Sequence, residues 1–193
     1  MKMGIEIDWQ RRHYDFPVER IKLAEKLGYD MVFTAGANGS DPISPLGHVL
    51  GITERIGIGT RIAQNIGISA PALAMFYQTM RHMAPQREII AGIGSSSPTI
   101  AEGWHGIPWT APYHRMKDFV AVMRKAFRNE IVEIDGKVLT IPYHPPGEKP
   151  TQLPMKPILE CQDNIPIIFG GGTELMLTLA AEIGDGLLPN GTW

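Results

Sequence analysis

The stretch Glu88-Ile-Ile-Ala-Gly-Ile-Gly-Ser-Ser-Ser-Pro98 decides how the rest of the sequence is interpreted. Its isoleucine-rich part predicts a short strand buried on both faces, which is typical of a parallel sheet. The strand ends at Gly94, where Ser95, Ser96 and Ser97 offer hydroxyls and backbone N–H groups. Two interpretations of this end stay open: a turn that caps a helix, or an edge where a planar ligand approaches the backbone.

Three units of one strand and one helix precede this stretch. In each unit a run of β-forming residues is followed by a loop and then by apolar residues at helical spacing. The expected strands are Gly4–Asp8, Met31–Thr34 and Ile56–Ile62, and the expected helices run from Asp15 to Gly28, from Ser44 to about Glu54 and from Ser69 to Met80.

The second half of the chain is less regular. Glu102–Trp109 is rich in aromatic residues and glycine and predicts a covering loop, and a long amphipathic helix begins at Pro112. Alternation around Asp135-Gly136 predicts a small hairpin within residues 130–141. The six prolines of Pro142–Pro157 indicate an extended linker. The expected sheet resumes at Pro166–Phe169, continues through a helix opened by Gly170–Thr173, and ends with a strand at Leu187–Leu188.

Repeated β/α units with right-handed crossovers form either an open doubly wound sheet or a closed eight-fold barrel. The polar and glycine-rich segments all follow strands, and no Gly-x-Gly-x-x-Gly motif opens a helix after the first strand. We therefore expect a TIM (β/α)8-type barrel of about six β/α units with a small hairpin excursion, forming one domain over residues 1–193. In either architecture the ligand lies at the carboxyl ends of the strands.

Composition excludes several classes of protein. With 193 residues, 44% hydrophobic residues and 20% charged residues, we expect a soluble globular protein with a substantial core. The net charge of -2, with both signs interspersed, argues against a nucleic-acid or membrane partner. Cys161 cannot form an internal disulfide, and no apolar stretch is long enough to cross a bilayer. We expect a cytoplasmic location, with a small molecule or a second copy of the chain as partner.

Six motifs in register resemble one known family. They are Gly28-Tyr-Asp30, Thr53-Glu-Arg-Ile-Gly-Ile-Gly-Thr60, Pro71-Ala-Leu-Ala74, Pro85-Gln-Arg87, Glu102-Gly-Trp-His-Gly-Ile-Pro108 and Ala180-Ala-Glu-Ile-Gly-Asp-Gly186. In this order they resemble the bacterial luciferase-like monooxygenase superfamily, in its branch of coenzyme F420-dependent oxidoreductases. The resemblance implies a TIM barrel that binds F420, or FMN as the alternative, and transfers a hydride between the cofactor and a small organic substrate.

The resemblance also implies which residues contact the cofactor. The family's third strand ends against the ring and often contains a non-prolyl cis peptide, which corresponds here to Thr60, Arg61 and Ile62. Arg61 could pair with a carboxylate or phosphate, or cap the barrel rim. The end of the fourth strand implies ring and linker contacts for Gly94, Ser95, Ser96 and Ser97.

The phosphate contact is expected at Gly170, Gly171, Gly172 and Thr173, where backbone N–H groups and a helix start can face an anion. The alternative is a tight turn that needs glycine at positive φ. Asn190 and Gly191 could extend this surface.

The catalytic candidates are Asp8, at a strand end, and His105, in the expected covering loop beside Trp104. No metal is expected. Family members with a dedicated proton donor often carry an acid where this chain has Ser97, so the resemblance assigns no general acid. Hydride transfer itself needs mainly orientation and a dry site.

The motifs account for six of the eight units of a barrel. An open arc of six strands would expose its edges, so we expect either a longer protein or closure by a homodimer. Three functional interpretations follow from this. The first is an oxidoreductase, the second is a flavin-binding protein without turnover, and the third is an inactive fragment of a longer monooxygenase.

Overall fold

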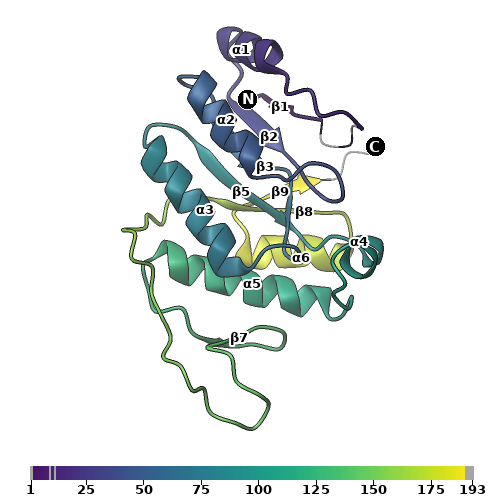
Figure 1. The fold of residues 1–193 in the computed structure, drawn as a ribbon, viewed down its shortest axis with the longest axis vertical. Helices are drawn as coiled ribbons and strands as arrows, with labels where there is room; N and C mark the ends of the chain where they lie inside the picture. Colours follow the sequence, from purple (N-terminus) through teal and green to yellow (C-terminus); the bar gives the residue numbers. More distant parts are fainter. Residues whose placement is uncertain (1, 9, 11, 190–193) are drawn as a thin grey trace.

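A parallel sheet organises the structure, a computed structural model that describes residues 2–8, 10 and 12–189 (Figure 1). Its strands are hydrogen-bonded in the order β1-β2-β3-β5-β8-β9, and a short strand, β4, also pairs with β5. Every pair in this sheet is parallel. The strands are β1 (Gly4–Glu6), β2 (Met31–Thr34), β3 (Gly57–Thr60), β4 (Ala63–Gln64), β5 (Ile89–Gly94), β8 (Ile167–Gly171) and β9 (Gly186–Pro189).

Helices connect the successive strands and follow one another around the outside of the sheet (Figure 1). They are α1 (Val18–Lys26), α2 (Ser44–Ile52), α3 (Ala70–Met83), α4 (Pro98–Gly103), α5 (Pro112–Phe127) and α6 (Glu174–Ile183). A two-stranded antiparallel hairpin, β6 (Ile134–Asp135) and β7 (Thr140–Ile141), lies between α5 and β8. This arrangement is about six β/α units of a TIM-type barrel, which confirms the fold predicted from the sequence.

One local prediction was wrong, and a second holds only in part. The expected third strand, 56–62, is interrupted, because β3 ends at Thr60 and the chain resumes pairing only at Ala63 in β4. The region around 102–109 does not begin as a loop, because residues 98–103 form the short helix α4, which starts at Pro98 directly after the serines. The hairpin around Asp135-Gly136 and the final strand are confirmed.

The core lies between the sheet and its helices. All six residues of β5 are buried, and Ile89 and Ile93 of this strand pack in the same core as Tyr77 of α3 and Phe119 of α5. Asp118, also on α5, is only 8% exposed, and its Oδ2 accepts hydrogen bonds from the backbone N–H groups of Val138 and Leu139 at 2.7 and 3.1 Å. This buried carboxylate fixes the hairpin to the helix.

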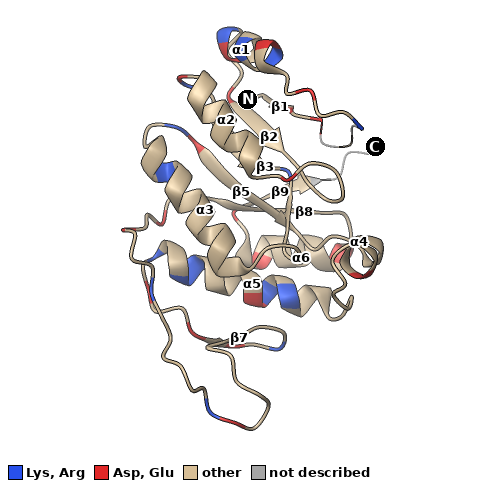
Figure 2. Ribbon diagram, viewed as in Figure 1, with Lys and Arg blue, Asp and Glu red and all other residues tan. Residues whose placement is uncertain are grey.

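Charged residues lie mainly on the helices and the connecting loops, with both signs interspersed, as Figure 2 shows. No helix in the described part of the chain combines the length and the hydropathy that a membrane span requires.

Candidate functional site

A cleft of about 740 Å³ opens at the carboxyl ends of the strands. This is the edge where parallel β/α folds bind ligands. The described residues that line it are Glu6, Gln10, Ala35, Gly36, Ala37, Asn38, Arg61, Ile62, Gln64, Gly94, Ser95, Ser96, Ser97, Ile100, Gly170, Gly171, Gly172, Thr173 and Met176. The cleft thus brings together ten of the eleven residues expected to contact a cofactor, and it adds several that sequence reasoning missed.

The peptide bond between Arg61 and Ile62 is cis, as the resemblance implied for this position. It lies between β3 and β4, and the side chain of Ile62 lies against two glycines. A β-carbon placed on Gly94 would lie 2.6 Å from Ile62 Cδ1, and one on Gly170 would lie 2.5 Å from Ile62 Cγ2. The absence of side chains at Gly94 and Gly170 therefore makes room for Ile62, which forms part of the cleft wall.

Thr60 lies beneath the cleft and does not line it. Its side chain is fully buried, and its hydroxyl lies 2.5 Å from the carbonyl oxygen of Gly92 and 2.6 Å from the hydroxyl of Tyr77. The hydroxyl of Thr60 has one hydrogen, which it donates to Gly92, so the hydroxyl of Tyr77 donates to Thr60. Thr60 therefore supports the end of β3 from below.

The serines after β5 line the cleft, as expected for a ligand edge. Ser96 has a φ of 73°, an uncommon value for a residue other than glycine, and its hydroxyl donates to Gln64 Oε1 at 3.0 Å. Within the described part of the chain, the side chains of Ser95 and Ser97 have no hydrogen-bond partner in the protein. Ser97 also precedes α4 without capping it through its side chain. The stretch thus leads into a helix that it does not cap through a side chain, and it borders the cleft. The approach of a planar ligand to this edge stays a prediction.

The glycines between β8 and α6 have different local roles. None of Gly170, Gly171 and Gly172 has a positive φ, so the alternative of a turn that requires such glycines is wrong. Gly170 makes room for Ile62, whereas a β-carbon on Gly172 would meet nothing within 4 Å, and one on Gly171 would make only an ordinary contact with Met176. Neither backbone conformation nor packing explains glycine at positions 171 and 172.

Thr173 caps helix α6. Its hydroxyl oxygen accepts a hydrogen bond from the backbone N–H of Met176 at 3.4 Å, and its carbonyl oxygen accepts from the N–H groups of Met176 and Leu177 at 3.0 and 2.9 Å. Residues 190 and 191, which were expected to extend this surface, lie outside the described residues.

One ion pair crosses the cleft. Arg61 Nη1 lies 2.6 Å from Glu6 Oε2, and each side chain is about one-third exposed, at 37% and 32%. Glu6 is the one carboxylate among the described lining residues, and the sequence analysis did not single it out. The signal that could have found it is an acidic residue inside the first strand, where apolar residues alternate with it.

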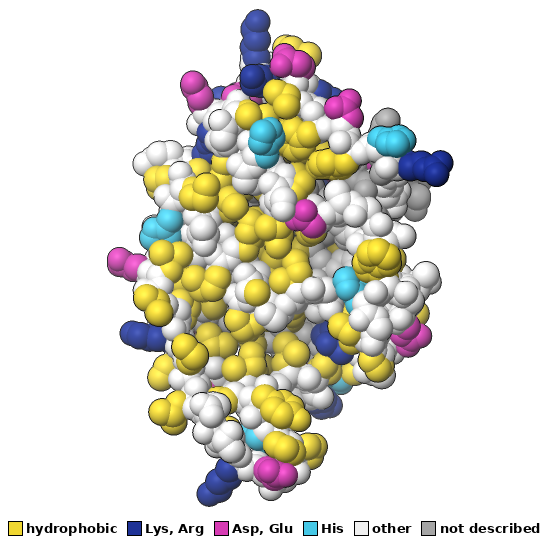
Figure 3. All heavy atoms as spheres, viewed as in Figure 1, with side chains coloured by type: hydrophobic (Ala, Val, Ile, Leu, Met, Phe, Trp, Pro, Cys, Tyr) yellow, Lys and Arg dark blue, Asp and Glu magenta, His cyan; other side chains and the backbone are white. Residues whose placement is uncertain are grey.

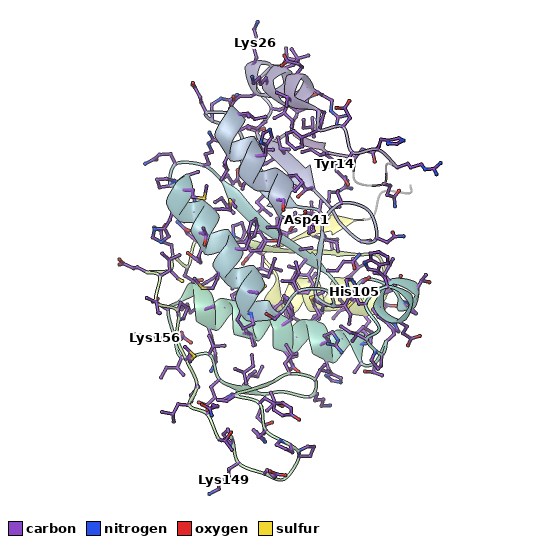
Figure 4. The ribbon with its side chains drawn as sticks, in the orientation of Figure 1. Tyr14, Lys26, Asp41, His105, Lys149 and Lys156 are labelled. Atoms are coloured by element: carbon purple, nitrogen blue, oxygen red, sulfur yellow. The ribbon has the colours of Figure 1, made fainter. Side chains whose placement is uncertain are left out.

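The two catalytic candidates from the sequence do not line this cleft. The carboxylate of Asp8 accepts from the backbone N–H of Gln10 at 3.1 Å and borders a separate cavity of about 180 Å³ with Asp15 and Arg20. The ring of His105 follows α4 and lies against Gly67 (Figure 4). In the described residues, no group of three or more His, Cys, Asp or Glu side chains could hold a metal ion.

The fold and the cleft define a TIM-barrel protein with its ligand site at the carboxyl ends of the strands. A family model described as luciferase-like monooxygenase matches residues 3–193, and the chain belongs to this family. This membership confirms the resemblance seen in the motifs.

Curated relatives have nearly twice the length of this chain. The sequence is 33% identical over 192 residues to Rv3520c of Mycobacterium tuberculosis. The match covers 98% of this chain and 55% of that protein, whose name assigns it to the coenzyme F420-dependent oxidoreductases. The sequence is also 28% identical over 191 residues to the 5,10-methylenetetrahydromethanopterin reductase of Archaeoglobus fulgidus. This match covers 98% of this chain and 53% of that protein. The chain thus spans about half the length of the curated relatives it matches.

Solved structures share the fold. The coenzyme F420-dependent tetrahydromethanopterin reductase of Methanopyrus kandleri superposes with a TM-score of 0.79 at 19% identity, over 98% of this chain and 55% of the other. A second structure is the oxygenating constituent of 3,6-diketocamphane monooxygenase from Pseudomonas putida, solved in complex with FMN. It gives a TM-score of 0.73 at 16% identity, over 94% of this chain and 55% of the other.

Proposed function

We propose that the cleft binds a deazaflavin or flavin, and that the chain forms part of an oxidoreductase that transfers a hydride between this cofactor and a small organic substrate. Coenzyme F420 is the first candidate, because the names of the Mycobacterium tuberculosis relative and of the Methanopyrus kandleri structure both carry it. FMN is the alternative, supported by the Pseudomonas putida complex.

The observation that carries this proposal is the pair of glycines at 171 and 172. They lie between the end of β8 and the start of α6, both line the cleft, and neither is required by φ or by packing. Backbone N–H groups before a helix attract an anion, and missing side chains let it approach closely. The glycines and Thr173 would therefore hold the cofactor phosphate.

The part of the cleft formed by Ile62 and the serines after β5 suits a ring. Ile62 offers an apolar wall at the cis peptide, and Ser95 and Ser97 offer hydroxyls to the polar edge of a deazaflavin or flavin. These groups come from the ends of β3 and β5, which are fixed by buried contacts beneath the cleft. A rigid floor of this kind orients a bound ring without further reorganisation.

The bound cofactor would supply the two-electron hydride chemistry. The residues of the chain would orient it and exclude water, with Ile100 and Met176 as apolar parts of the lining. Glu6 is the residue we propose for holding or moving a proton, because its carboxylate borders the cleft whereas Asp8 and His105 do not.

The test is a fluorescence and absorbance titration of the purified chain with F420 and, separately, with FMN. Gly171→Asp should place a carboxylate at the phosphate position and weaken binding at least tenfold. Gly171→Asn is the matched control, with the same size and no charge, and should bind more tightly than Gly171→Asp. Equal affinity of wild type and Gly171→Asp would contradict the phosphate assignment.

The same titration, combined with an anaerobic assay that follows oxidation of the reduced cofactor with and without a candidate substrate, separates the three functional interpretations. An oxidoreductase binds the cofactor and oxidises its reduced form only when a substrate is present. A flavin-binding protein binds it without turnover, and a fragment that needs further strands does not bind it although it is folded.

We propose a homodimer as the assembly. The edge strands β1 and β9 each have one neighbour in the sheet, and Leu187 of β9 is 41% exposed. Apolar side chains also gather over the middle of the face shown in Figure 3. Light scattering of the purified chain should give the mass of two copies, and a monomer at micromolar concentration would contradict this proposal.

A further inference from the structure

A second cavity, of about 550 Å³, lies between the segment before α1 and the loop that leads into α2, together with the first residues of α2. It is lined by Tyr14, Phe16, Ser40, Asp41, Ser44, Pro45 and His48, none of which lines the cleft. We call it the aromatic pocket. The loop of residues 35–42 separates the two cavities, because its first part borders the cleft and Ser40 and Asp41 border the aromatic pocket.

Three rings form the walls of the aromatic pocket. The centroids of Phe16 and His48 are 4.6 Å apart with their planes at 81°, an edge-to-face pair, and those of Tyr14 and Phe16 are 6.4 Å apart at 51°. The rings contact one another, so a ligand does not fit between them, but a ligand in the cavity can lie over them, and the π face of a neutral aromatic ring carries negative electrostatic potential.

A fixed carboxylate completes the aromatic pocket. Asp41 Oδ1 accepts hydrogen bonds from the backbone N–H groups of Ile43 and Ser44 at 2.8 and 2.7 Å, which hold the side chain at the start of α2. Asp41 is exposed, and both of these bonds use the same oxygen. Tyr14 and Asp41, labelled in Figure 4, come from the two segments that enclose the pocket.

The charge of Asp41 has no cation beside it in this lining. The described residues that border the aromatic pocket include no lysine and no arginine. Aromatic faces and an uncompensated carboxylate attract the same kind of ligand, a weakly hydrated organic cation, and the volume is in the range of small-molecule sites. An anion would meet Asp41, and a neutral apolar ligand would leave the carboxylate unused.

We propose that the aromatic pocket binds a small organic ammonium compound in the cavity, with the cationic nitrogen over the rings of Tyr14 and Phe16 and near the carboxylate of Asp41. Quaternary ammonium groups fit best, because their methyl groups contact aromatic faces while the positive charge remains on the group. This site is independent of the cofactor cleft and needs no cofactor to be occupied.

The probe for this proposal is choline, with its neutral isostere 3,3-dimethylbutan-1-ol as the matched control ligand. Binding to the purified chain without cofactor is followed by calorimetry and by the NMR shift of the probe's methyl signal. Choline should bind saturably and at least fivefold more tightly than the isostere, and its methyl signal should move upfield because of the aromatic rings.

Two variants separate the contribution of the Asp41 charge to choline binding from that of the Phe16 ring. Asp41→Asn keeps the side-chain oxygen that accepts from Ile43 and Ser44, since asparagine caps a helix about as well as aspartate, but it removes the charge. It should weaken choline binding about fivefold and leave the isostere unchanged. Phe16→Leu keeps the apolar character and removes the π face, and it should lower choline affinity more than isostere affinity.

Circular dichroism must show both variants folded for these comparisons. The proposal is overturned if wild-type protein binds choline no better than 3,3-dimethylbutan-1-ol, or not at all at millimolar concentration. Unchanged choline affinity in folded Asp41→Asn would overturn it as well. Failure of F420 or FMN to bind would not affect this result, because the probe experiment uses the chain alone.

Discussion

Arg61 at the end of β3 forms an ion pair with Glu6 at the end of β1, with Nη1 and Oε2 2.6 Å apart. The pair links two strands that are separated by β2 in the sheet, and both residues border the cleft. Because each side chain is about one-third exposed, water screens the attraction, and the pair contributes at most about 1 kcal/mol to stability. Its position therefore matters more for the cleft than for folding.

Glu6→Gln should separate the contribution of Glu6 to the chemistry of the cleft from its contribution to stability. The free energy of unfolding should change by no more than about 1 kcal/mol. Cofactor affinity should stay within about threefold of wild type, whereas substrate-dependent oxidation of the reduced cofactor should fall about 10² to 10⁴-fold if Glu6 moves a proton. The matched control is Glu88→Gln, which breaks the surface ion pair with Lys2 at 2.7 Å, away from the cleft. Full turnover in Glu6→Gln would exclude the proposed role.

The contact of Ile62 with two glycines gives a prediction about packing. Gly94→Ala and Gly170→Ala should each destabilise the protein by about 1–3 kcal/mol, because the added methyl group meets the side chain of Ile62. At Gly94 the nearest atom is Cδ1, which valine lacks, and at Gly170 it is Cγ2, which valine keeps. Ile62→Val should therefore restore part of the stability of Gly94→Ala, where Cγ1 still lies 3.0 Å from the β-carbon position, but none of that of Gly170→Ala.

Urea unfolding of the two double variants measures this difference. Failure of Ile62→Val to rescue Gly94→Ala would show that the end of the Ile62 side chain is not what this alanine meets, and rescue of Gly170→Ala would contradict the contact with Cγ2. Gly172→Ala is the reference for a harmless methyl group in the same region, since its β-carbon would meet nothing within 4 Å.

The hairpin depends on one buried carboxylate. Asp118→Ala removes the acceptor of the N–H groups of Val138 and Leu139, and we expect a loss of about 1–3 kcal/mol. Gly136→Ala should have a similar effect, because its β-carbon would overlap the carboxylate of Asp118. Faster proteolytic cleavage within residues 130–145, with the sheet still protected from hydrogen exchange, would confirm this anchoring. Uniform loss of protection would contradict it.

Much of the fold could be predicted because its signals are local. The β5 stretch is apolar on both faces and ends in glycine and serine, so both its burial and its place at the cleft followed from residue types alone. The interruption after Thr60 could not follow from local pattern, because Arg61, Ile62 and Ala63 continue a plausible strand. It depends on room made by Gly94 and Gly170, which are distant in sequence.

Some residues of the candidate site could also be predicted from a local signal in the sequence, and others could not. Gly171 and Gly172 stood out because three consecutive glycines are unusual, and the structure places them on the cleft. Glu6 was missed and Asp8 chosen, although both belong to the same alternating segment at the first strand. The choice depended on where β1 ends, and that boundary is set by pairing with β2, which stops at Glu6. Sequence alone does not fix an element boundary this closely.

Tyr77 gives the last prediction, a dependence of stability on alkaline pH. Burial raises the pKa of Tyr77 above its ordinary value of 10.0, an effect that the hydrogen bond with Thr60 reduces only in part. Above about pH 10 the tyrosine of the unfolded chain loses its proton while the folded chain keeps it, so the unfolded state binds fewer protons. The stability that Tyr77 contributes is complete below pH 10 and is lost as the pH rises toward the folded pKa.

Tyr77→Phe should therefore cost about 1 kcal/mol near pH 7, because the donor to Thr60 is removed, and it should make the decline of stability above pH 10 less steep. Tyr143→Phe is the matched control: Tyr143 is 78% exposed, and the decline should match that of wild type. Thermal unfolding measured from pH 7 to pH 11 tests both. An unchanged slope in Tyr77→Phe would mean that the hydroxyl ionises as readily in the folded protein as in the unfolded chain, which its full burial beside Thr60 argues against.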